Sequence, residues 1–198
     1  MTKGEETRER ILESAYRLAS RDGLLGISIG VLATDTGLSK SGLFAHFGSK
    51  EDLQVAVIDA AARRFEETVV RPAFEAPRGR PRLKRWFDNW LQWFADPDSL
   101  GGCIFIAASA ELDDHEGRPR SALVGHQRRL MKSIAKAVAL AVEVGHFHRH
   151  LDGEQFAFEM YGILLGLSHA RRLLRDPKAE ERARTAFDRL LADSAARS

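Results

Sequence analysis

The stretch from Leu24 to Leu53, LLGISIGVLATDTGLSKSGLFAHFGSKEDL, holds the signals that decide the fold of this chain. Ser28, Ser39 and Ser49 each stand where a side-chain oxygen can cap the start of a helix. Gly37 follows the first of these segments, at a position where the end of a helix favours a left-handed residue. The spacing therefore predicts two short helices joined by a tight turn, and then a longer helix.

The rest of the chain shows the same helical character. Its apolar residues recur at helical spacing, and no segment has the alternating pattern of a strand. Breaks at Gly and Pro residues divide the chain into nine expected helices. Six have expected bounds, at about 3–21, 28–36, 40–46, 49–71, 103–112 and 154–174. The fifth holds the aromatic residues from 86 to 94 and ends near 97, the seventh opens at Gly117 and Pro119 and ends before the break at 145–153, and the ninth follows Pro177. The expected fold class is all-α.

Composition is that of a folded protein of the cell interior. Of the 198 residues 44% are apolar and 29% charged, and no apolar run approaches the roughly 18 residues of a membrane span. The charged N-terminal segment lacks the apolar centre of a secretory signal. Cys103 is the only cysteine, which excludes a disulfide within the chain. We therefore expect a cytoplasmic protein with no membrane partner.

The placement of polar residues, rather than charge, indicates a DNA partner. Residues 1–50 carry seven Lys or Arg against six Asp or Glu, so net charge does not identify a nucleic-acid binder. The second short helix begins with small polar residues that would let its backbone approach the floor of a major groove. Leu43 and Phe47 are spaced to anchor this helix on a core. This pattern is typical of a helix-turn-helix, and the alternative is an ordinary three-helix packing unit with a polar turn.

The same stretch resembles the DNA-binding segment of the TetR (tetracycline-repressor) family of transcriptional regulators. The matching positions are Ser28, Leu32, Ala33, Gly37, Leu38, Ser39, Leu43, His46, Phe47, Lys50, Glu51 and Leu53. The resemblance implies a nine-helix TetR-like architecture, with a three-helix DNA-binding domain at 1–48, a helical ligand-binding and dimerisation domain at 49–198, and a connecting helix from about 49 to 71. It also implies a ligand-responsive repressor that binds a pseudo-palindromic operator as a homodimer.

By this resemblance, eight residues of the expected DNA-binding domain at 1–48, called the head below, and of the helix start that follows it are expected to contact DNA. Phe44 stands where the family usually has Tyr and so lacks a phosphate-binding hydroxyl, and Gly42 stands where a small hydroxyl residue or Ala is common. The expected phosphate contacts are Ser28, His46 and Lys50, and the expected base or groove contacts are Ser39, Lys40, Ser41 and Gly42, with Phe44 packing against sugar or bracing the helix.

The last two expected helices carry more apolar surface than one neighbour can cover, which indicates a dimer interface. Gly162 and Gly166, one turn apart, would allow two helices to approach closely. Burial of the same apolar residues inside one subunit is the alternative. The expected interface residues are Phe156, Met160, Ile163, Gly166, Leu167, Phe187, Leu190 and Leu191.

Aromatic residues that recur one helical turn apart, Trp86, Trp90 and Phe94, suggest an effector pocket. Aromatic and Met side chains line many apolar ligand sites, although such residues are more often simple core. The aromatic supply favours a small, largely apolar or aromatic effector. The expected lining residues are Trp86, Trp90, Phe94, Cys103, Phe105, Ser109, Met131, Tyr161 and His169.

A metal- or redox-sensing regulator is the second hypothesis. His146, His148 and His150 could together bind a metal ion, and Cys103 at a helix start could sense oxidants. A solvated loop without metal and a buried structural cysteine are the favoured alternatives, and the acidic helix end at Glu111 is interpreted as solvated. No catalytic or phosphate-binding motif occurs, so neither an enzyme nor a cofactor is expected.

Overall fold

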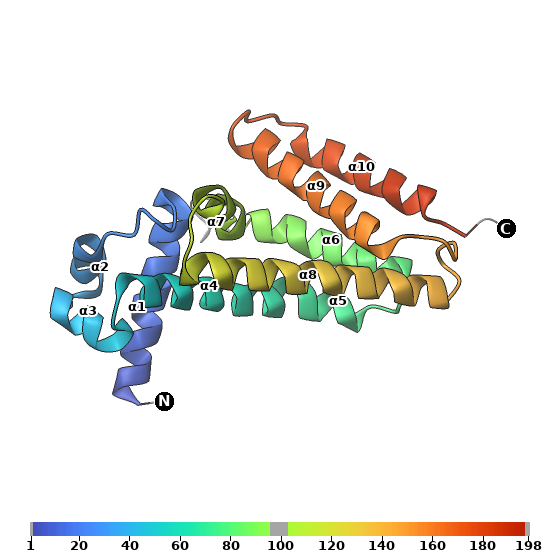
Figure 1. Ribbon diagram of the computed structural model, residues 1–198. Helices are drawn as coiled ribbons and strands as arrows, with labels where there is room; N and C mark the ends of the chain where they lie inside the picture. The colour runs from blue at the N-terminus through green and yellow to red at the C-terminus, as the bar shows by residue number, and fades with distance from the viewer. Residues whose placement is uncertain (1, 96–102, 197–198) are drawn as a thin grey trace. The chain divides into compact units, whose positions relative to one another are not determined.

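The computed structural model describes residues 2–95 and 103–196, and in these ranges the regular structure is helical apart from one isolated bridge between Phe147 and Ala195 (Figure 1). The chain divides into two compact units. The first comprises Met1–Arg64 with Ala95–His126, and the second comprises Phe65–Phe94 with Gln127–Ser198. The expected end of the fifth helix, near residue 97, lies outside the described residues.

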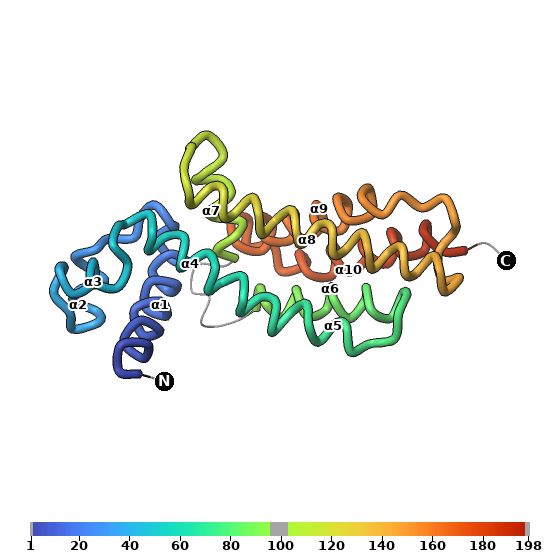
Figure 2. The backbone as a smooth tube through the Cα atoms, turned by 60° about the horizontal axis from the view of Figure 1, so that its bottom comes forward, coloured from blue at the N-terminus to red at the C-terminus, as the bar shows by residue number. Residues whose placement is uncertain are grey.

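The first unit begins with a long helix, two short ones and the start of another long one, and α7 joins them later in the chain. These are α1 (Lys3–Asp22), α2 (Ile29–Thr36), α3 (Lys40–Phe47), α4 (Lys50–Phe65) and α7 (Ile104–Leu112). Figures 1 and 2 both show α2 and α3 beside α1. This is the arrangement expected of a helix-turn-helix with its supporting helix.

Local capping sets the ends of the first three helices. Thr2 and Glu5 form a reciprocal capping box at the start of α1, and the Ser28 and Ser39 hydroxyls cap α2 and α3. Gly37 ends α2 with φ 68°, and its N–H donates to carbonyls of the last turn of that helix. These caps confirm the expected starts and ends within one or two residues.

The core of the helix-turn-helix contains residues from each of its helices. Ile11 and Leu32 are fully buried, and Leu43 and Phe47 of α3 are 2% and 7% exposed. Truncating a buried leucine to alanine typically costs about 2–5 kcal/mol of stability. Leu43 and Phe47 therefore fix the position of α3, as their spacing predicts.

The helix that begins with α4 extends beyond its expected end near residue 71. It continues through a π-helical turn, η1 (Glu66–Val70), into α5 (Arg71–Glu75). Pro72 lies in the first turn of α5, where a residue without an N–H is tolerated. The wider π turn just before it lets the chain continue, so the run ends only at Glu75. With this run counted as one helix, the described residues contain the nine helices predicted.

The second unit consists of η1, α5, α6 (Arg80–Ala95), most of α8 (Arg118–Glu143), α9 (Gly153–Arg172) and α10 (Ala179–Asp193). The last two helices lie side by side and antiparallel (Figure 1). Aromatic rings join them to α6, because Phe87 stacks on Phe187 with 4.0 Å between ring centroids and Phe156 lies 6.5 Å from Phe187. None of the described helices is long and apolar enough to cross a membrane.

Candidate functional site

The first turn of α3 presents a small, polar surface. The Ser39 hydroxyl accepts a hydrogen bond from the N–H of Gly42 at 3.0 Å and lies 2.9 Å from the hydroxyl of Ser41. A hydroxyl can donate one hydrogen bond and accept two, so beside its contact with Ser39 the Ser41 hydroxyl keeps hydrogen-bonding capacity for an outside partner. Small side chains here give the backbone access to a groove floor.

Most of the residues expected to contact DNA lie at the surface of the head, whereas Leu43 and Phe47 between them are buried. Phe44 is 40% exposed, in contrast to the buried Leu43 and Phe47 on either side. The exposed members of the set are Ser28, Ser39, Lys40, Ser41, Phe44 and Lys50, and the half-buried ones are Gly42 and His46. Their exposure is compatible with DNA binding, and contact between these residues and DNA stays a prediction.

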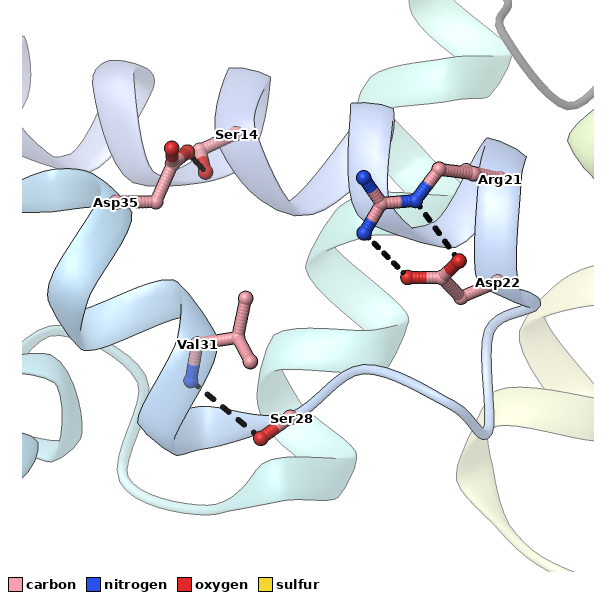
Figure 3. Close-up of polar contacts among 6 residues, drawn as sticks. All are labelled: Ser14, Arg21, Asp22, Ser28, Val31 and Asp35. Atoms are coloured by element: carbon pink, nitrogen blue, oxygen red, sulfur yellow. Dashed lines mark hydrogen bonds and ion pairs between the residues drawn. The ribbon is translucent and has the colours of Figure 1, made fainter.

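Two hydrogen bonds, one that caps the start of α2 and one that joins α2 to α1, fix the position of α2 (Figure 3). The Ser28 hydroxyl accepts from the N–H of Val31 at 3.4 Å, and the hydroxyl of Ser14 on α1 donates to the carboxylate of Asp35 on α2. The Ser14–Asp35 bond ties the two helices together. It also gives Asp35, an acidic residue of the head, a partner within the protein.

The loop between α1 and α2 is held by side chains from distant parts of the chain. The Glu111 carboxylate on α7 accepts from the N–H of Leu25 at 2.7 Å, and the Lys50 ammonium donates to the Leu25 carbonyl at 3.0 Å. Gln54 donates to the carbonyl of Leu24 at 3.2 Å. The peptide groups of this loop are thus bound from α4 and α7. Lys50 uses one of its three donors here and keeps two for a phosphate.

Sequence reasoning misses two members of this set, Gln54 and Glu111, and the acidic helix end at Glu111 is interpreted as solvated. The Glu111 carboxylate lies so close to Gly23 that a Cβ at that position would overlap it. Gly23 also has φ 88°, a conformation that favours glycine. Gly23 and Glu111 therefore fit together, and the 86-residue separation between Glu111 and Leu25 explains why no local pattern revealed the contact.

The start of α4 carries a second polar connection. Asp52 accepts from the hydroxyl of Ser49 at 2.6 Å and forms an ion pair with Arg118 at the start of α8. The Ser49 hydrogen bond, and then the Arg118 bond, hold the pKa of Asp52 below its usual range. Asp52, Arg118 and His46 line an open cleft of about 300 Å³ beside α3. His126 of α8 lies 2.7 Å from the carboxylate of Asp59 on α4.

The expected effector-lining residues divide between the two units, and each group is described by itself. In the first unit Cys103 is buried at the start of α7, Phe105 is half-buried, and the Ser109 hydroxyl donates to the Phe105 carbonyl at 2.7 Å. In the second unit Trp86 and Trp90 are buried, while His169 is exposed on α9. The half-buried residues of the second unit in this set are Phe94, Met131 and Tyr161. Their role in ligand binding stays a prediction.

The second unit buries most of the residues expected at a dimer interface within a single chain. The reason is that Phe187 stacks on Phe87 and contacts Phe156, which fills the space between α6, α9 and α10. The buried residues are Phe156, Met160, Leu167, Phe187, Leu190 and Leu191. Ile163 is half-buried, and Gly166 is exposed with open space around it. The outward apolar residues of α9 are instead Phe158, 67% exposed, and Leu165, 38% exposed.

The His-rich loop between α8 and α9 does not gather its imidazoles at one point. His146 accepts from the N–H of Arg80 through Nδ1 at 3.3 Å, whereas His150 accepts from Arg149 at 3.0 Å. His148 donates its backbone N–H to Ser194. In residues 2–95 and 103–196 no cluster of His, Cys, Asp or Glu could hold a metal ion. The metal-sensing alternative therefore gains no support from this loop.

Comparison with known proteins gives matches along most of the chain. A family model described as bacterial regulatory proteins, tetR family, matches residues 11–57, and one described as tetracyclin repressor-like, C-terminal domain, matches residues 79–187. The chain is 24% identical over 184 residues to the HTH-type transcriptional repressor NemR of Escherichia coli K12, covering 90% of each chain.

Solved structures show the same fold. A TetR transcriptional regulator from Chloroflexus aurantiacus superposes with a TM-score of 0.85 at 25% identity, covering 97% of this chain and 96% of that one. The structure of AibR in complex with isovaleryl coenzyme A and operator DNA has a TM-score of 0.75 at 23% identity, covering 93% and 98% of the two chains. The all-α architecture expected from the sequence is thereby confirmed.

Proposed function

The chain belongs to the TetR family of bacterial transcriptional repressors, and from this premise we propose that it binds a pseudo-palindromic operator as a homodimer and releases it when a small molecule binds. The two family models and the match to a named repressor confirm the resemblance found in the N-terminal stretch. The operator, the dimer contact and the effector are the parts that we propose. Action on operator DNA would place the protein in the cytoplasm.

The observation that carries the DNA-binding proposal is the two-sided character of α3. Leu43 and Phe47 anchor one side of this helix in the core, while Ser39, Lys40 and Ser41 are exposed at its first turn. A recognition helix needs this combination, because its first turn must enter the major groove while its other side stays packed. Two such helices in a dimer would read half-sites about 34–36 Å apart.

The exposed face of α9 supports a homodimer contact. Phe158 and Leu165 lie on this face, and the open space beside Gly162 and Gly166 would admit the helix of a second copy. Because an isologous contact brings each patch against itself, two antiparallel copies of α9 would place the acidic first half of one against the basic second half of the other. The exposed charges are Glu154 and Glu159 in the first half, and Arg171 and Arg172 in the second.

Release by a small molecule needs a connection between the effector and the head. Within the first unit, α7 reaches the head through Glu111, and α8 reaches α4 through the pairs of Arg118 with Asp52 and His126 with Asp59. We expect movement of α7 or of the start of α8 to alter the loop before α2. AibR, a protein of this fold, was crystallised in complex with isovaleryl coenzyme A and operator DNA, so the fold can bind a small molecule as well as an operator.

Selection of bound DNA from a random pool tests this proposal. The wild-type protein should enrich sequences with two related half-sites in inverted orientation, because the dimer has two-fold symmetry. A Leu43→Ala variant tests whether the anchoring of α3 in the core is required for sequence-specific DNA binding. Circular dichroism checks that the variant is folded. A selected pool without any recurring motif would contradict sequence-specific operator binding.

A further inference from the structure

The three tryptophans of the chain lie on one helix, and each has a buried indole N–H without an acceptor. Trp86, Trp90 and Trp93 of α6 are 0%, 3% and 4% exposed, and among the described residues none of their Nε1 atoms has a hydrogen-bond partner. Buried tryptophans usually find an acceptor for this group, because an unpaired buried donor lowers stability. Three such donors on successive turns of one helix require an explanation.

The three indoles share one face of α6, since positions 86, 90 and 93 are one helical turn apart, and each contacts a phenylalanine of the second unit. Phe65 contacts Trp90 and Trp93 edge to face, with centroid separations of 4.9 and 5.2 Å, and Phe74 lies 5.6 Å from Trp86. Phe65 is the last residue of α4 and Phe74 lies in α5, which runs beside α6 in Figure 2. The donors therefore belong to one aromatic surface rather than to three unrelated places.

The polar side chains beside this surface are uncharged or already engaged. Asn89, 6% exposed, donates to the Val69 carbonyl in the π turn at 3.0 Å. Tyr161 on α9 lies 6.1 Å from Trp90 and accepts from Gln127. Arg82, over the Phe74 ring, donates to backbone carbonyls. The donors of Arg82 are thus used by carbonyl oxygens, so a buried carboxylate would have to displace them to gain a charged partner, and a neutral acceptor fits this surface better.

We propose that the effector is a planar, apolar molecule that bears neutral carbonyl oxygens and accepts hydrogen bonds from the indole N–H groups of Trp86, Trp90 and Trp93. This inference rests on the proposed function and refines the largely apolar effector expected from composition. Seven residues separate the first indole from the last, a rise of about 10 Å along α6. An effector that uses all three donors carries oxygens spread over a similar length.

The test uses the indole region of a proton–nitrogen correlation spectrum of the full chain. With three tryptophans in the sequence, only three indole signals occur, and single Trp→Phe variants assign them. Three probes of similar shape are titrated: acetylnaphthalene with a neutral carbonyl, isopropylnaphthalene without an acceptor, and naphthoate with a charge. Each phenylalanine variant removes the N–H donor and part of the ring volume but keeps one buried aromatic ring, which limits the risk of unfolding.

Acetylnaphthalene should move at least one indole proton signal downfield, and it should bind more tightly than isopropylnaphthalene. Trp90→Phe should weaken acetylnaphthalene binding by about three- to tenfold more than isopropylnaphthalene binding, the value of one neutral hydrogen bond. The proposal is overturned if the hydrocarbon or naphthoate binds best, or if no probe moves an indole signal. It is also overturned if the free protein already shows downfield, slowly exchanging indole protons, which would reveal an acceptor within the chain.

A separate measurement keeps failure of this proposal apart from failure of the repressor function. Binding of the pool-selected DNA by the free protein is measured for wild type and the three Trp→Phe variants. Because the indoles lie on α6, outside the helix-turn-helix, DNA affinity should stay within about twofold of wild type. Loss of DNA binding in the wild type would overturn the repressor function and with it this proposal, whereas intact DNA binding with silent indoles would overturn the effector class alone.

Discussion

Replacement of Glu111 by alanine should loosen the loop that leads into the helix-turn-helix. In the wild type the Glu111 carboxylate accepts from the N–H of Leu25 at 2.7 Å, a charge-assisted contact between α7 and the head. Such hydrogen bonds contribute about 1.5–3 kcal/mol. Leu25 is 38% exposed, so water replaces part of the lost bond and the lower end of this range applies. A loss of about 1.4 kcal/mol corresponds to tenfold.

Amide hydrogen exchange measures this effect directly at the residue concerned. The Leu25 amide of Glu111→Ala should exchange about tenfold faster than in wild type, provided that the loop opens locally rather than with the whole protein. Glu111→Gln keeps an oxygen that can accept and should restore most of the protection. Asp113→Ala is the matched control, because the Asp113 side chain is exposed and accepts a local hydrogen bond from the N–H of its neighbour Asp114.

The same substitution should weaken operator binding. If the loop must be ordered for α2 and α3 to enter the groove, affinity for the selected DNA falls by up to tenfold in Glu111→Ala and recovers in Glu111→Gln. Because coupling between two sites is reciprocal, bound DNA should in turn slow amide exchange in α7 of the wild type but not of Glu111→Ala. Unchanged exchange at Leu25 in Glu111→Ala would refute the role assigned to this contact.

Four further substitutions test other parts of the account. Lys50→Ala should weaken binding to all DNA sequences and reduce the slope of log affinity against log salt by about one, as measured by titration at several salt concentrations; an unchanged slope would show that Lys50 does not contact phosphate. Ser41→Ala should alter base preference at one position of each half-site in a repeated selection, and an unchanged motif would exclude base reading by this hydroxyl. Asp52→Asn should lower the denaturant midpoint of unfolding at neutral pH, and its difference from wild type should shrink below about pH 4. The reason is that the pKa of Asp52 is lowered in the folded protein, so its ionised carboxylate stabilises the fold above the ordinary pKa and this stabilisation is lost as the pH falls. Phe158→Asp should shift the protein toward monomer in sedimentation experiments and weaken operator binding, whereas an unaltered dimer would place the interface elsewhere.

The sequence predicts the head well because its signals are local. Ser28 and Ser39 cap their helices by contacts to residues three positions away, and Gly37 ends α2 through its own backbone conformation. Leu43 and Phe47 are buried as their helical spacing requires. Caps, turns and apolar periodicity all act over a few residues, so one stretch of about thirty residues suffices to predict this part of the fold.

Contacts between distant segments could not be predicted in the same way. The bond from Glu111 to Leu25 depends on how helices pack, and nothing near either residue in the sequence specifies it. The π turn before Pro72 lets the helix continue past a proline, where the sequence pattern predicts that it ends. Phe156 and Phe187 show the same limit, because their apolar character fits a dimer interface as well as a core. In the structure Phe187 stacks on Phe87, and both Phe156 and Phe187 are buried in the core of the second unit, whereas Phe158 is the exposed aromatic residue of α9.

The orientation of the two half-sites on DNA tests the central claim most directly. Once a selected operator is known, inserting about five base pairs between its half-sites rotates one by half a turn relative to the other. A dimer whose two copies of α3 read successive major grooves on one face of the duplex should then lose most of its affinity, measured by fluorescence anisotropy. Affinity that stays the same after this insertion would contradict a two-fold symmetric dimer that reads both half-sites at once.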